Sequence, residues 1–562
     1  MDGEIRTVLL AAALQNAVKH RSLPAAGAVM GAVMGNHPEL RARAAELKGL
    51  LPDVMTEVSS LSVDQQEELL GRIAPDLLAA LSEKKEKRRQ TLPDLPGAEG
   101  GVVMRFAPNP SGPLHLGHAR AAFLNDEYIR RYGGEYILRI EDTDPKRVDT
   151  AAYEMVPEDI TWMGLGITRT IYQSDRFSLY YDVGRQLIEK GAAYVCRCNN
   201  EEFKTLKMQK AACPCRSQTV EEAAGLFEEM LEGRFAEGEV SVRLRTDLNH
   251  PDPAMRDYPL FRVLTSTPHE RVDAIVYPLM NLSVAVDDHL LGMTHVIRGK
   301  DHIANTGRQK FIFEYLGWKQ PVYRHYGRMG IEGVVLSTSQ MRQGISAGEY
   351  SGWDDVHLGT LRAMARRGIQ PDAVRNAVVE IGIGDTDIQF SWENLYAKNK
   401  EIVDPKADRF FFVPDPVELE IGGAAPVTAR AMRYPGDEGR GFREIPFTGR
   451  IVVPRSEIRE GTSMIRLKDL FNITVSSENG LYAARFAGDD LQQAREAKAP
   501  IIQWLPAGYG MACRLRRADG DMTGVCEPEV GTWKDRVVQF ERVGFSRIDR
   551  ADGEITAYFS HR

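Results

Sequence analysis

The chain has 562 residues, a formal net charge of −8 and six cysteines. This length predicts several domains with ample hydrophobic core. Because no segment is apolar enough to span a membrane, the amino terminus lacks an export signal and cysteines are few, we expect a cytoplasmic protein without a membrane partner or a disulfide scaffold. The acidic balance argues mildly against a nucleic-acid partner unless Lys and Arg gather on one face.

The first 92 residues predict a helical appendage. They are rich in Ala, Leu, Glu and Lys at helical spacing, and Ser62-Val-Asp-Gln65 has the pattern of a capping box that opens a helix. The segment ends in the basic run Lys84–Arg89, before a Pro/Gly linker from Pro93 to Gly101. The basic run is compatible with contact to RNA or a partner protein, and equally with a solvated helix end whose cations favour the helix dipole.

A strand, a rigid turn and the start of a helix are predicted by residues 105–120, RFAPNPSGPLHLGHAR. Three prolines stiffen the turn, and Gly112 and Gly117 leave room for a ligand phosphate. A helix N-terminus attracts anions, and His115 and His118 lie about one turn apart, so both imidazoles can face the same polyphosphate. We predict that these two histidines are catalytic. The predicted ATP-binding residues of the turn are Pro108, Asn109, Pro110, Ser111, Gly112, Leu116 and Gly117.

A buried parallel strand followed by polar residues is predicted over 136–145, YILRIEDTDP. Because ligands collect at the carboxyl ends of strands in open α/β sheets, we expect Arg105 and Glu141 at the rim of one crevice. There Glu141 can bind the ammonium group of an amino acid, and Arg105 can bind a carboxylate. An ordinary strand-end salt bridge is the alternative.

Four of the six cysteines lie within residues 192–274, a stretch that interrupts the α/β pattern. They form two Cys-x-Cys pairs, which together supply the number of ligands of a tetrahedral structural zinc site. The alternative is four reduced cysteines that pack a small loop. The candidate metal ligands are Cys196, Cys198, Cys213 and Cys215.

Residues 277–302 predict a helix-like run that ends in Asp287, Asp288 and His289, followed by a second strand into the crevice. Helical elements are expected over residues 332–404. Beyond Asp404, short segments alternate apolar and polar residues at period two, with turn residues between them. This pattern predicts one or two β-barrels, a fold suited to reading an RNA loop by stacking and edge contacts.

These motifs together resemble the class I aminoacyl-tRNA synthetases. The segment His115-x-Gly-His118 is similar to the nucleotide-binding signature of that family, in the wording of the glutamyl branch, and residues 277–302 resemble the same branch over their whole length. The β-rich carboxyl-terminal region is similar to archaeal-type members rather than to bacterial glutamyl enzymes, whose anticodon part is helical.

The resemblance implies a multidomain α/β plus all-β protein built around a Rossmann-type catalytic core. The implied domains are a helical appendage at 1–92, two halves of the core at 100–191 and 275–331, an inserted domain for the tRNA acceptor end at 192–274, a helical connector with a phosphate loop at 332–404, and a β-barrel anticodon-binding region at 405–562. Zinc in the insertion would shape that domain rather than take part in chemistry.

The resemblance also assigns Arg298 to a substrate carboxylate. A substrate with two carboxylates needs two cationic groups, which Arg105 and Arg298 supply, whereas an uncharged amide would leave one guanidinium unpaired. Glutamate is therefore favoured over glutamine. Bacterial members have tyrosine in the place of Met280, so we expect this part of the pocket to be built differently. The predicted glutamate-binding residues are Arg105, Glu141, Met280 and Arg298.

Residues 335–341, VLSTSQM, depart from the family pattern. They are the counterpart of a mobile loop that usually brings a lysine to the ATP phosphates, but Val335, Thr338 and Gln340 stand where lysine is expected. Arg342 is a candidate to share the task with serine hydroxyls and backbone amides. The predicted ATP-binding residues of this loop are Ser337, Thr338 and Ser339.

The implied activity is that of a glutamate–tRNA ligase. ATP activates L-glutamate to glutamyl-adenylate while Mg²⁺ neutralises the leaving pyrophosphate, and the glutamyl group then passes to the 3′ end of tRNA(Glu). Whether tRNA(Gln) is also charged, and whether the N-terminal helices bind a protein partner, is left open. The alternatives are a glutaminyl-tRNA synthetase, a nucleotidyltransferase acting on a small molecule, and a non-catalytic tRNA-binding protein.

Overall fold

The computed structural model describes residues 2–20, 24, 26–77, 92–478, 480–550 and 553–562. It divides into two compact units, residues 1–91 and 92–562. The basic run Lys84–Arg89 lies outside the described residues. Within the described ranges, no helix is both long and apolar enough to cross a lipid bilayer.

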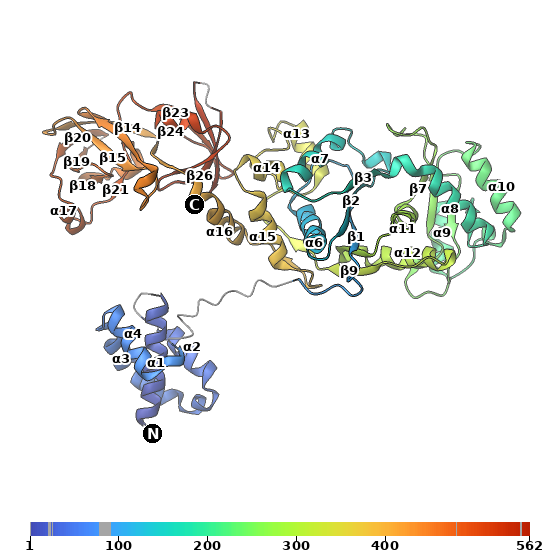
Figure 1. The fold of residues 1–562 in the computed structure, drawn as a ribbon, viewed down its shortest axis with the longest axis horizontal. Coiled ribbons are helices and arrows are strands. Elements are labelled where there is room, and N and C mark those ends of the chain that lie inside the picture. Colours follow the sequence, from blue (N-terminus) through green and yellow to red (C-terminus); the bar gives the residue numbers. More distant parts are fainter. Residues whose placement is uncertain (1, 21–23, 25, 78–91, 479, 551–552) are drawn as a thin grey trace. The chain divides into compact units, whose positions relative to one another are not determined.

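The N-terminal unit is helical (Figure 1). Its described helices are α1 (Asp2–His20), α2 (Ala26–Asn36), α3 (Ala44–Ser59) and α4 (Val63–Ile73). Their apolar faces share one core, in which Leu14 and Val33 are at most 1% exposed. The predicted capping box opens α4: the Ser62 N–H donates to Gln65 Oε1 over 2.9 Å, and Ser62 Oγ accepts from the Gln65 N–H over 3.3 Å.

The α/β core is built on parallel strands. They are β1 (Val102–Phe106), β2 (Gly134–Ile140), β3 (Arg169–Tyr172), β8 (His295–Gly299) and β9 (Val322–Tyr326). β2 pairs with β1 and β3, and β8 pairs with β9. Thr294, just before β8, donates its N–H to the carbonyl of Val103 in β1 over 3.0 Å. The strands thus follow the order β3-β2-β1-β8-β9, and their carboxyl ends meet along one edge.

Helices connect these parallel strands, as parallel pairing requires. They include α6 (Leu116–Tyr132), α7 (Ala152–Met163), α11 (Met280–Leu290) and α12 (Ile303–Leu316). α6 is the next element after β1, and it packs against β1 and β2 (Figure 1) and also against β8. Phe123 of α6 and Ile140 of β2 are fully buried in the same cluster, so packing fixes where α6 begins relative to the strand ends.

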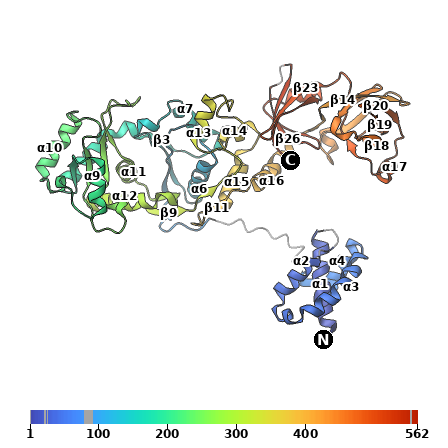
Figure 2. The ribbon, with the colours of Figure 1, turned by 180° about the vertical axis from the view of Figure 1, so that it is seen from behind.

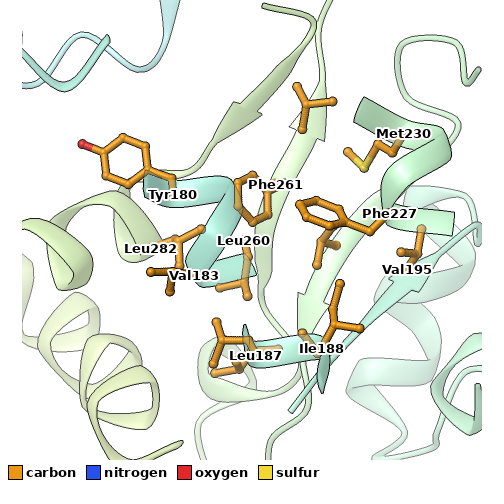
Figure 3. Close-up of a cluster of buried hydrophobic side chains, with 14 of the residues drawn as sticks. Tyr180, Val183, Leu187, Ile188, Val195, Phe227, Met230, Leu260, Phe261 and Leu282 are labelled. Atoms are coloured by element: carbon orange, nitrogen blue, oxygen red, sulfur yellow. The ribbon is translucent and has the colours of Figure 1, made fainter. Parts of the chain in front are cut away.

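The predicted insertion holds an antiparallel sheet of four strands among its described residues. Its strands and neighbouring helices are β4 (Ala193–Cys196), β5 (Ser241–Leu244), β6 (Pro259–Val263), β7 (Val276–Pro278), α8 (Phe177–Glu189), α9 (Asn200–Met208) and α10 (Val220–Leu231). Figure 3 shows the shared core, to which α8 contributes Leu187, α10 contributes Phe227 and β6 contributes Phe261. Because β7 pairs with β6 up to Pro278, the sheet continues past the predicted boundary at residue 274.

The segment after the α/β core is mostly helical, as predicted. It contains α13 (Thr338–Ser346), α14 (Leu361–Arg366), α15 (Pro371–Ile381) and α16 (Trp392–Val403), with β10 (Met329–Gly330) paired to β11 (Ile388–Gln389). α15 packs against α6, and the buried Arg375 donates to Asp126 over 2.6 Å across this contact. The connector is therefore fixed to the helix that carries the two predicted catalytic histidines.

The carboxyl-terminal region is formed by β-sheets, as predicted. One seven-stranded sheet has the order β12 (Arg409–Phe410), β25 (Val537–Phe540), β26 (Gly544–Arg550), β27 (Ile555–His561), β23 (Met511–Arg516), β24 (Met522–Cys526), β13 (Phe412–Pro414). The other has the order β21 (Ile501–Ile502), β18 (Gly461–Leu467), β19 (Asn472–Glu478), β20 (Leu481–Phe486), β14 (Pro416–Gly422), β17 (Arg450–Pro454), β22 (Leu505–Pro506). A hairpin of β15 (Val427–Met432) and β16 (Phe442–Phe447) and the short helix α17 (Leu491–Glu496) complete the region.

Period-two alternation in the sequence matches the burial in these sheets. Figure 2 shows β14 and β18–β20 side by side. In β19, Ile473 and Val475 are fully buried, while Thr474 between them is partly exposed. Strands of this kind bury one face and leave the other to solvent.

Candidate active site

A cavity of about 610 Å³ lies at the carboxyl ends of β1, β2 and β8. It collects residues from five separate stretches of the sequence, which the order of the strands brings together. The predicted site residues that line it are Arg105, Pro108, Asn109, His115, Gly117, His118, Glu141, Met280 and Arg298. The two predicted guanidinium groups and the two imidazoles therefore share one space.

The two histidines form the N-terminal cap of α6. His115 is the N-cap residue, and its Nδ1 accepts a hydrogen bond from the Gly117 N–H over 3.1 Å. The Nδ1 of His118 accepts from the His115 N–H over 3.3 Å, and the two rings stack with centroids 3.8 Å apart. Because each Nδ1 accepts, the ring proton of each neutral histidine resides on Nε2, which is then a donor.

Both imidazoles are held neutral. Burial lowers the pKa of His115 from its ordinary 6.5 to about 4. Burial, reinforced by the neighbouring His115, lowers the pKa of His118 well below the same value. At neutral pH this end of the cavity therefore presents dipolar N–H donors at a helix N-terminus, an arrangement suited to a polyphosphate.

The two glycines of the turn make room for protein atoms, while the predicted room for a ligand phosphate stays a prediction. A Cβ on Gly117 would lie 2.9 Å from Cε1 of His115, so glycine lets the imidazole fold back onto the helix amides. Gly112 has a φ of +152°, and a Cβ there would lie 2.6 Å from Cγ2 of Thr338. Gly112 thus allows the 335–341 loop to approach the turn.

The turn is also bonded to the end of β2. The Glu141 N–H donates to the carbonyl of Pro108 over 3.0 Å, and Asn109 Nδ2 donates to the carbonyl of Glu141 over 2.9 Å. These bonds leave Asn109 Oδ1 buried without a partner among the described residues. Glu141 is thereby fixed beside the phosphate-binding turn, where its carboxylate can meet a cationic group of a ligand.

A network of buried charges supports the other end of the cavity. Asp288 accepts from Arg139 over 2.7 Å and from Arg105 over 3.2 Å, and Arg139 also donates to Glu141 over 2.8 Å. The side chains of Arg139 and Asp288 are fully buried. Burial alone would raise the pKa of Asp288, but the guanidinium groups of Arg105 and Arg139 bring it below its ordinary value. The pair keeps its charges, and Arg105 is aligned by a carboxylate behind it.

Arg298 has no such counter-ion. Its Nη2 donates to Thr306 Oγ1 over 2.6 Å and to Gln309 Oε1 over 2.7 Å, and both acceptors are neutral. Its Nε is buried and unpaired, and no carboxylate oxygen of a described residue lies within 4.0 Å of the group. Burial, together with the nearby charge of Arg105, lowers the pKa of Arg298 to about 10. A buried cation held this way is suited to an anionic ligand.

Two family models match the chain. The one described as tRNA synthetases class I (E and Q), catalytic domain, matches residues 101–405, and the anti-codon binding domain of the same group matches residues 407–483. The chain belongs to this class I synthetase family. The catalytic-domain match spans the whole cavity, so the neutral imidazoles and the guanidinium groups described above lie inside the part of the chain that matches the catalytic domain of the family.

Full-length relatives of the chain are known from methanogenic archaea. A glutamate–tRNA ligase of Methanospirillum hungatei is 74% identical over 559 residues and 100% of both chains. Those of Methanoculleus marisnigri and Methanocaldococcus jannaschii are 61% and 47% identical, covering 100% and 99% of each chain. A crystal structure of a glutamate tRNA ligase from Elizabethkingia meningosepticum in complex with its amino acid is 22% identical, with a TM-score of 0.41 over 54% of this chain and 70% of that one.

The remaining predicted ATP-binding residues do not line the cavity. They are Pro110, Ser111, Gly112, Leu116, Ser337, Thr338 and Ser339. Leu116 has a fully buried side chain, and its N–H donates to the carbonyl of Gly359 over 3.1 Å, so it offers ATP no free polar group. Ser337 caps α13, and Arg342 donates to the Ser111 carbonyl over 2.7 Å and to Asp149 over 2.8 Å. The 335–341 loop thus lies against the turn before α6, and Arg342, just after the loop, bonds to that turn.

Three residues that the structure places in the cavity or directly behind it were given no site role from the sequence. Arg139 and Asp288 hold Arg105 in place, and His302 lines the cavity beside Arg298 and Glu141. A signal existed for the first two, because a charge inside an apolar strand or an apolar helical run needs a buried partner. His302 follows the strand end at Arg298 by four positions and carries no comparable signal.

The four cysteines of the insertion lie together. Their Sγ atoms are all within 4.8 Å of one another. Cys196 Sγ lies 4.0 Å from Cys213 Sγ, and Cys198 Sγ lies 3.9 Å from Cys215 Sγ. Tetrahedral zinc with Zn–S bonds of about 2.3 Å separates its sulfurs by about 3.8 Å. The arrangement therefore fits such an ion.

Proposed function

We propose that the chain is a glutamate–tRNA ligase, which uses ATP to activate L-glutamate and transfers the glutamyl group to the 3′ end of tRNA(Glu). The observation that carries this proposal is the shared cavity, with neutral N–H donors at a helix N-terminus on one side and paired guanidinium groups with a carboxylate on the other. The curated relatives bear the same activity in their names.

Glutamate fits the charged side of the cavity. Arg298 would bind the side-chain carboxylate, since it lacks an anionic partner of its own. Glu141 would bind the ammonium group, and Arg105 would face the second carboxylate while Asp288 holds its Nε. Glutamine would leave Arg298 without a counter-charge, at a cost of about 1.5–3 kcal/mol. Met280 supplies an apolar wall at the start of α11.

ATP fits the imidazole side. The Nε2–H groups of His115 and His118 would donate to phosphate oxygens as charge builds on them, while the α-carboxylate of glutamate attacks the α-phosphorus in line. Mg²⁺ bound with the phosphates would supply neutralising charge for the leaving pyrophosphate. The terminal hydroxyl of the tRNA then attacks the adenylate carbonyl and releases AMP, so no protein nucleophile is needed.

The tRNA is the proposed partner of the remaining domains. The match of residues 407–483 to the anti-codon binding domain supports a role of the carboxyl-terminal sheets in holding the anticodon, and the insertion would hold the acceptor end. Charging of tRNA(Gln) besides tRNA(Glu) and binding of a protein partner by the N-terminal helices remain parts of the proposal that need separate tests.

We also propose that Cys196, Cys198, Cys213 and Cys215 hold a structural zinc ion, which would cross-link β4 to the turn that follows α9. The test is the metal content of the purified chain by mass spectrometry. We expect one zinc per chain, lost in Cys213→Ser, with a lower melting temperature. A chain that folds and melts identically with and without chelator, and carries no zinc, would exclude the site.

The proposed activity is tested by charging purified tRNA(Glu) and tRNA(Gln) with labelled glutamate and glutamine side by side. We expect glutamate on at least one tRNA, and a loss of at least a hundredfold in kcat/KM for glutamate in Arg298→Ala. Preference for glutamine would favour the glutaminyl alternative, which the relatives do not support. Tight tRNA binding without any charging would favour a non-catalytic role.

A further inference from the structure

His302 lies at the glutamate end of the cavity but has no role in the function proposed above. It ends the turn Lys300–His302, directly before α12, and it lines the cavity together with Arg298 and Glu141. Burial and the nearby charge of Arg298 lower the pKa of His302, against a smaller raising effect of Glu141. At neutral pH the ring is therefore uncharged, and its function depends on which nitrogen carries the proton.

A chain of hydrogen bonds, the relay, determines which ring nitrogen of His302 carries the proton. Arg308 Nη1 donates to Asn305 Oδ1 over 2.8 Å, which fixes the orientation of the amide because a guanidinium can only donate. The other end of the amide, Nδ2, lies 3.1 Å from Nδ1 of His302. An amide nitrogen is a donor, so Nδ1 must accept, and the ring proton resides on Nε2. Arg308 is itself fixed by a bond from its Nε to the Ala254 carbonyl over 2.9 Å.

The same helix connects His302 rigidly to Arg298. Thr306 Oγ1 accepts from Arg298 Nη2 over 2.6 Å and donates to the His302 carbonyl over 3.1 Å. Within the described part of the chain, no protein atom forms a hydrogen bond with Nε2 of His302, so this nitrogen is free for a ligand in the cavity. The imidazole N–H and the guanidinium are thus two donors held in a fixed relation at one end of the pocket.

We propose that His302 is a specificity-determining residue that donates its Nε2–H to the side-chain carboxylate of the substrate beside Arg298, in the tautomer that Asn305 and Arg308 impose. This inference rests on the proposed use of glutamate. A carboxylate has two acceptor oxygens and satisfies both donors. The amide of glutamine has one acceptor, and its NH₂ group would meet a donor. A pocket that can only donate therefore selects the acid, whereas an imidazole in the opposite tautomer would accept from the amide.

Two substitutions test the Nε2–H donor and the hydrogen-bond relay separately. His302→Phe keeps an aromatic ring and removes the donor. Asn305→Asp replaces the amide by a carboxylate that accepts from Nδ1–H, so at pH 8.5, where the ring stays neutral, Nε2 becomes an acceptor. Glu314→Gln is the matched control, because it exchanges a carboxylate for an amide on the exposed side of the same helix. His302→Gln, which retains a donor, tests for rescue.

Kinetics of charging tRNA with glutamate and with glutamine provide the first readout. In His302→Phe and Asn305→Asp we expect KM for glutamate to rise about tenfold, with kcat changed much less, and the ratio of kcat/KM for glutamate over glutamine to fall about tenfold. His302→Gln should recover part of the KM, and Glu314→Gln should match the wild type. An unchanged KM and an unchanged ratio in a folded His302→Phe would overturn the proposal.

Nitrogen-15 NMR of histidine-labelled protein provides the second readout, with the His302 signals assigned by their loss in His302→Gln. We expect an Nε2-protonated tautomer in the wild type and an Nδ1-protonated one in Asn305→Asp. A wild-type ring protonated on Nδ1 would overturn the inference even if the chain charges tRNA with glutamate. Absence of glutamate charging by the wild type would instead overturn the proposed function, so the two failures are distinguishable.

Discussion

The two ends of the cavity present different kinds of polar group. At the end proposed for the ATP phosphates, the phosphate end, His115 and His118 are neutral, and backbone N–H groups fix their tautomers. At the end proposed for glutamate, the amino-acid end, Arg105 and Arg298 are buried cations, one of them aligned by Asp288 and the other held by neutral acceptors. One end offers dipoles and the other offers full charges.

The difference follows from what each proposed ligand brings with it. ATP arrives with Mg²⁺ that already neutralises part of its charge, so neutral N–H donors at a helix N-terminus suffice. The side-chain carboxylate of glutamate has no counter-ion, so the protein must keep a cation desolvated for it, at a cost in folding free energy. Removing a buried charge behind the amino-acid end should therefore lower the free energy of unfolding, whereas removing a neutral donor at the phosphate end should mainly lower kcat.

The largest effect is expected for Asp288→Asn. Removing this carboxylate leaves Arg105 and Arg139 buried without their shared counter-ion, which costs about 3–5 kcal/mol of unfolding free energy. Urea unfolding of the variant checks this value. Glu135→Gln on β2 is the control, because its partner Arg169 forms an ion pair in which both side chains are nearly half exposed, and such pairs contribute less than about 1 kcal/mol. Equal stability of the two variants would contradict the role given to the buried network.

A smaller effect, on rate rather than stability, is expected for His118→Asn. The amide oxygen can still accept from the His115 N–H, but the Nε2–H donor is lost, so kcat should fall about a hundredfold with little change in KM for glutamate. Steady-state charging of tRNA measures both constants. His289→Asn is the control, since this ring stacks on Trp318 and does not line the cavity. A fall in kcat of the same size in both variants would remove His118 from the reaction.

The sequence predicted the positions of the site better than its chemistry. Arg105 and Arg298 lie near the carboxyl ends of β1 and β8, and His115 and His118 lie at the start of α6. Such places can be predicted from hydrophobic patterns and turn residues. The partner of Arg139 could not be found this way, because Asp288 lies 149 positions away along the chain. The order of the strands decides which charges meet.

The protonation states of the two histidines also could not be predicted from the sequence. The tautomers of His115 and His118 depend on N–H groups within 3.3 Å of each Nδ1, which exist only once α6 has formed on β1. Gly117 is predicted to make room for a ligand, and in the structure its missing Cβ also makes room for the His115 ring, which the sequence pattern did not indicate. In both cases the chemical role of a residue depends on the backbone geometry around it, and the residue type alone does not specify that geometry.

As the pH falls, the phosphate end should lose its contribution to folding stability before the amino-acid end does. Because burial lowers the pKa of His115 from 6.5 to about 4, the unfolded chain takes up a proton below pH 6.5 that the folded chain refuses until about pH 4. This contribution to stability is full above pH 6.5 and is lost as the pH falls toward 4. Asp288, whose pKa lies below its ordinary 3.8, should lose its contribution only at lower pH.

Calorimetry of the wild type and His115→Asn between pH 7.5 and 4.5 tests this order. Asparagine retains a good N-cap for α6 and removes one titrating ring. We expect the melting temperature of the wild type to fall more steeply with decreasing pH than that of the variant. Parallel curves would show that His115 does not titrate differently in the folded and unfolded chain.

The smallest effect is expected for Arg342→Ala. This variant tests whether Arg342 supports ATP binding in the absence of the lysine that the family usually has in this loop. Arg342 ties the 335–341 loop to the turn through Ser111 and Asp149, but its side chain is 47% exposed, so solvent screens the pair. We expect KM for ATP to rise about two- to fivefold with no change in KM for glutamate, because Arg342 and Thr338 lie against the turn that precedes α6, on the imidazole side of the cavity. Arg342→Lys, which keeps the charge but not the two-point contact, should be intermediate. A rise in KM for glutamate of the same size would mean that the loop orders the whole cavity. The two ends of the cavity would then not act independently.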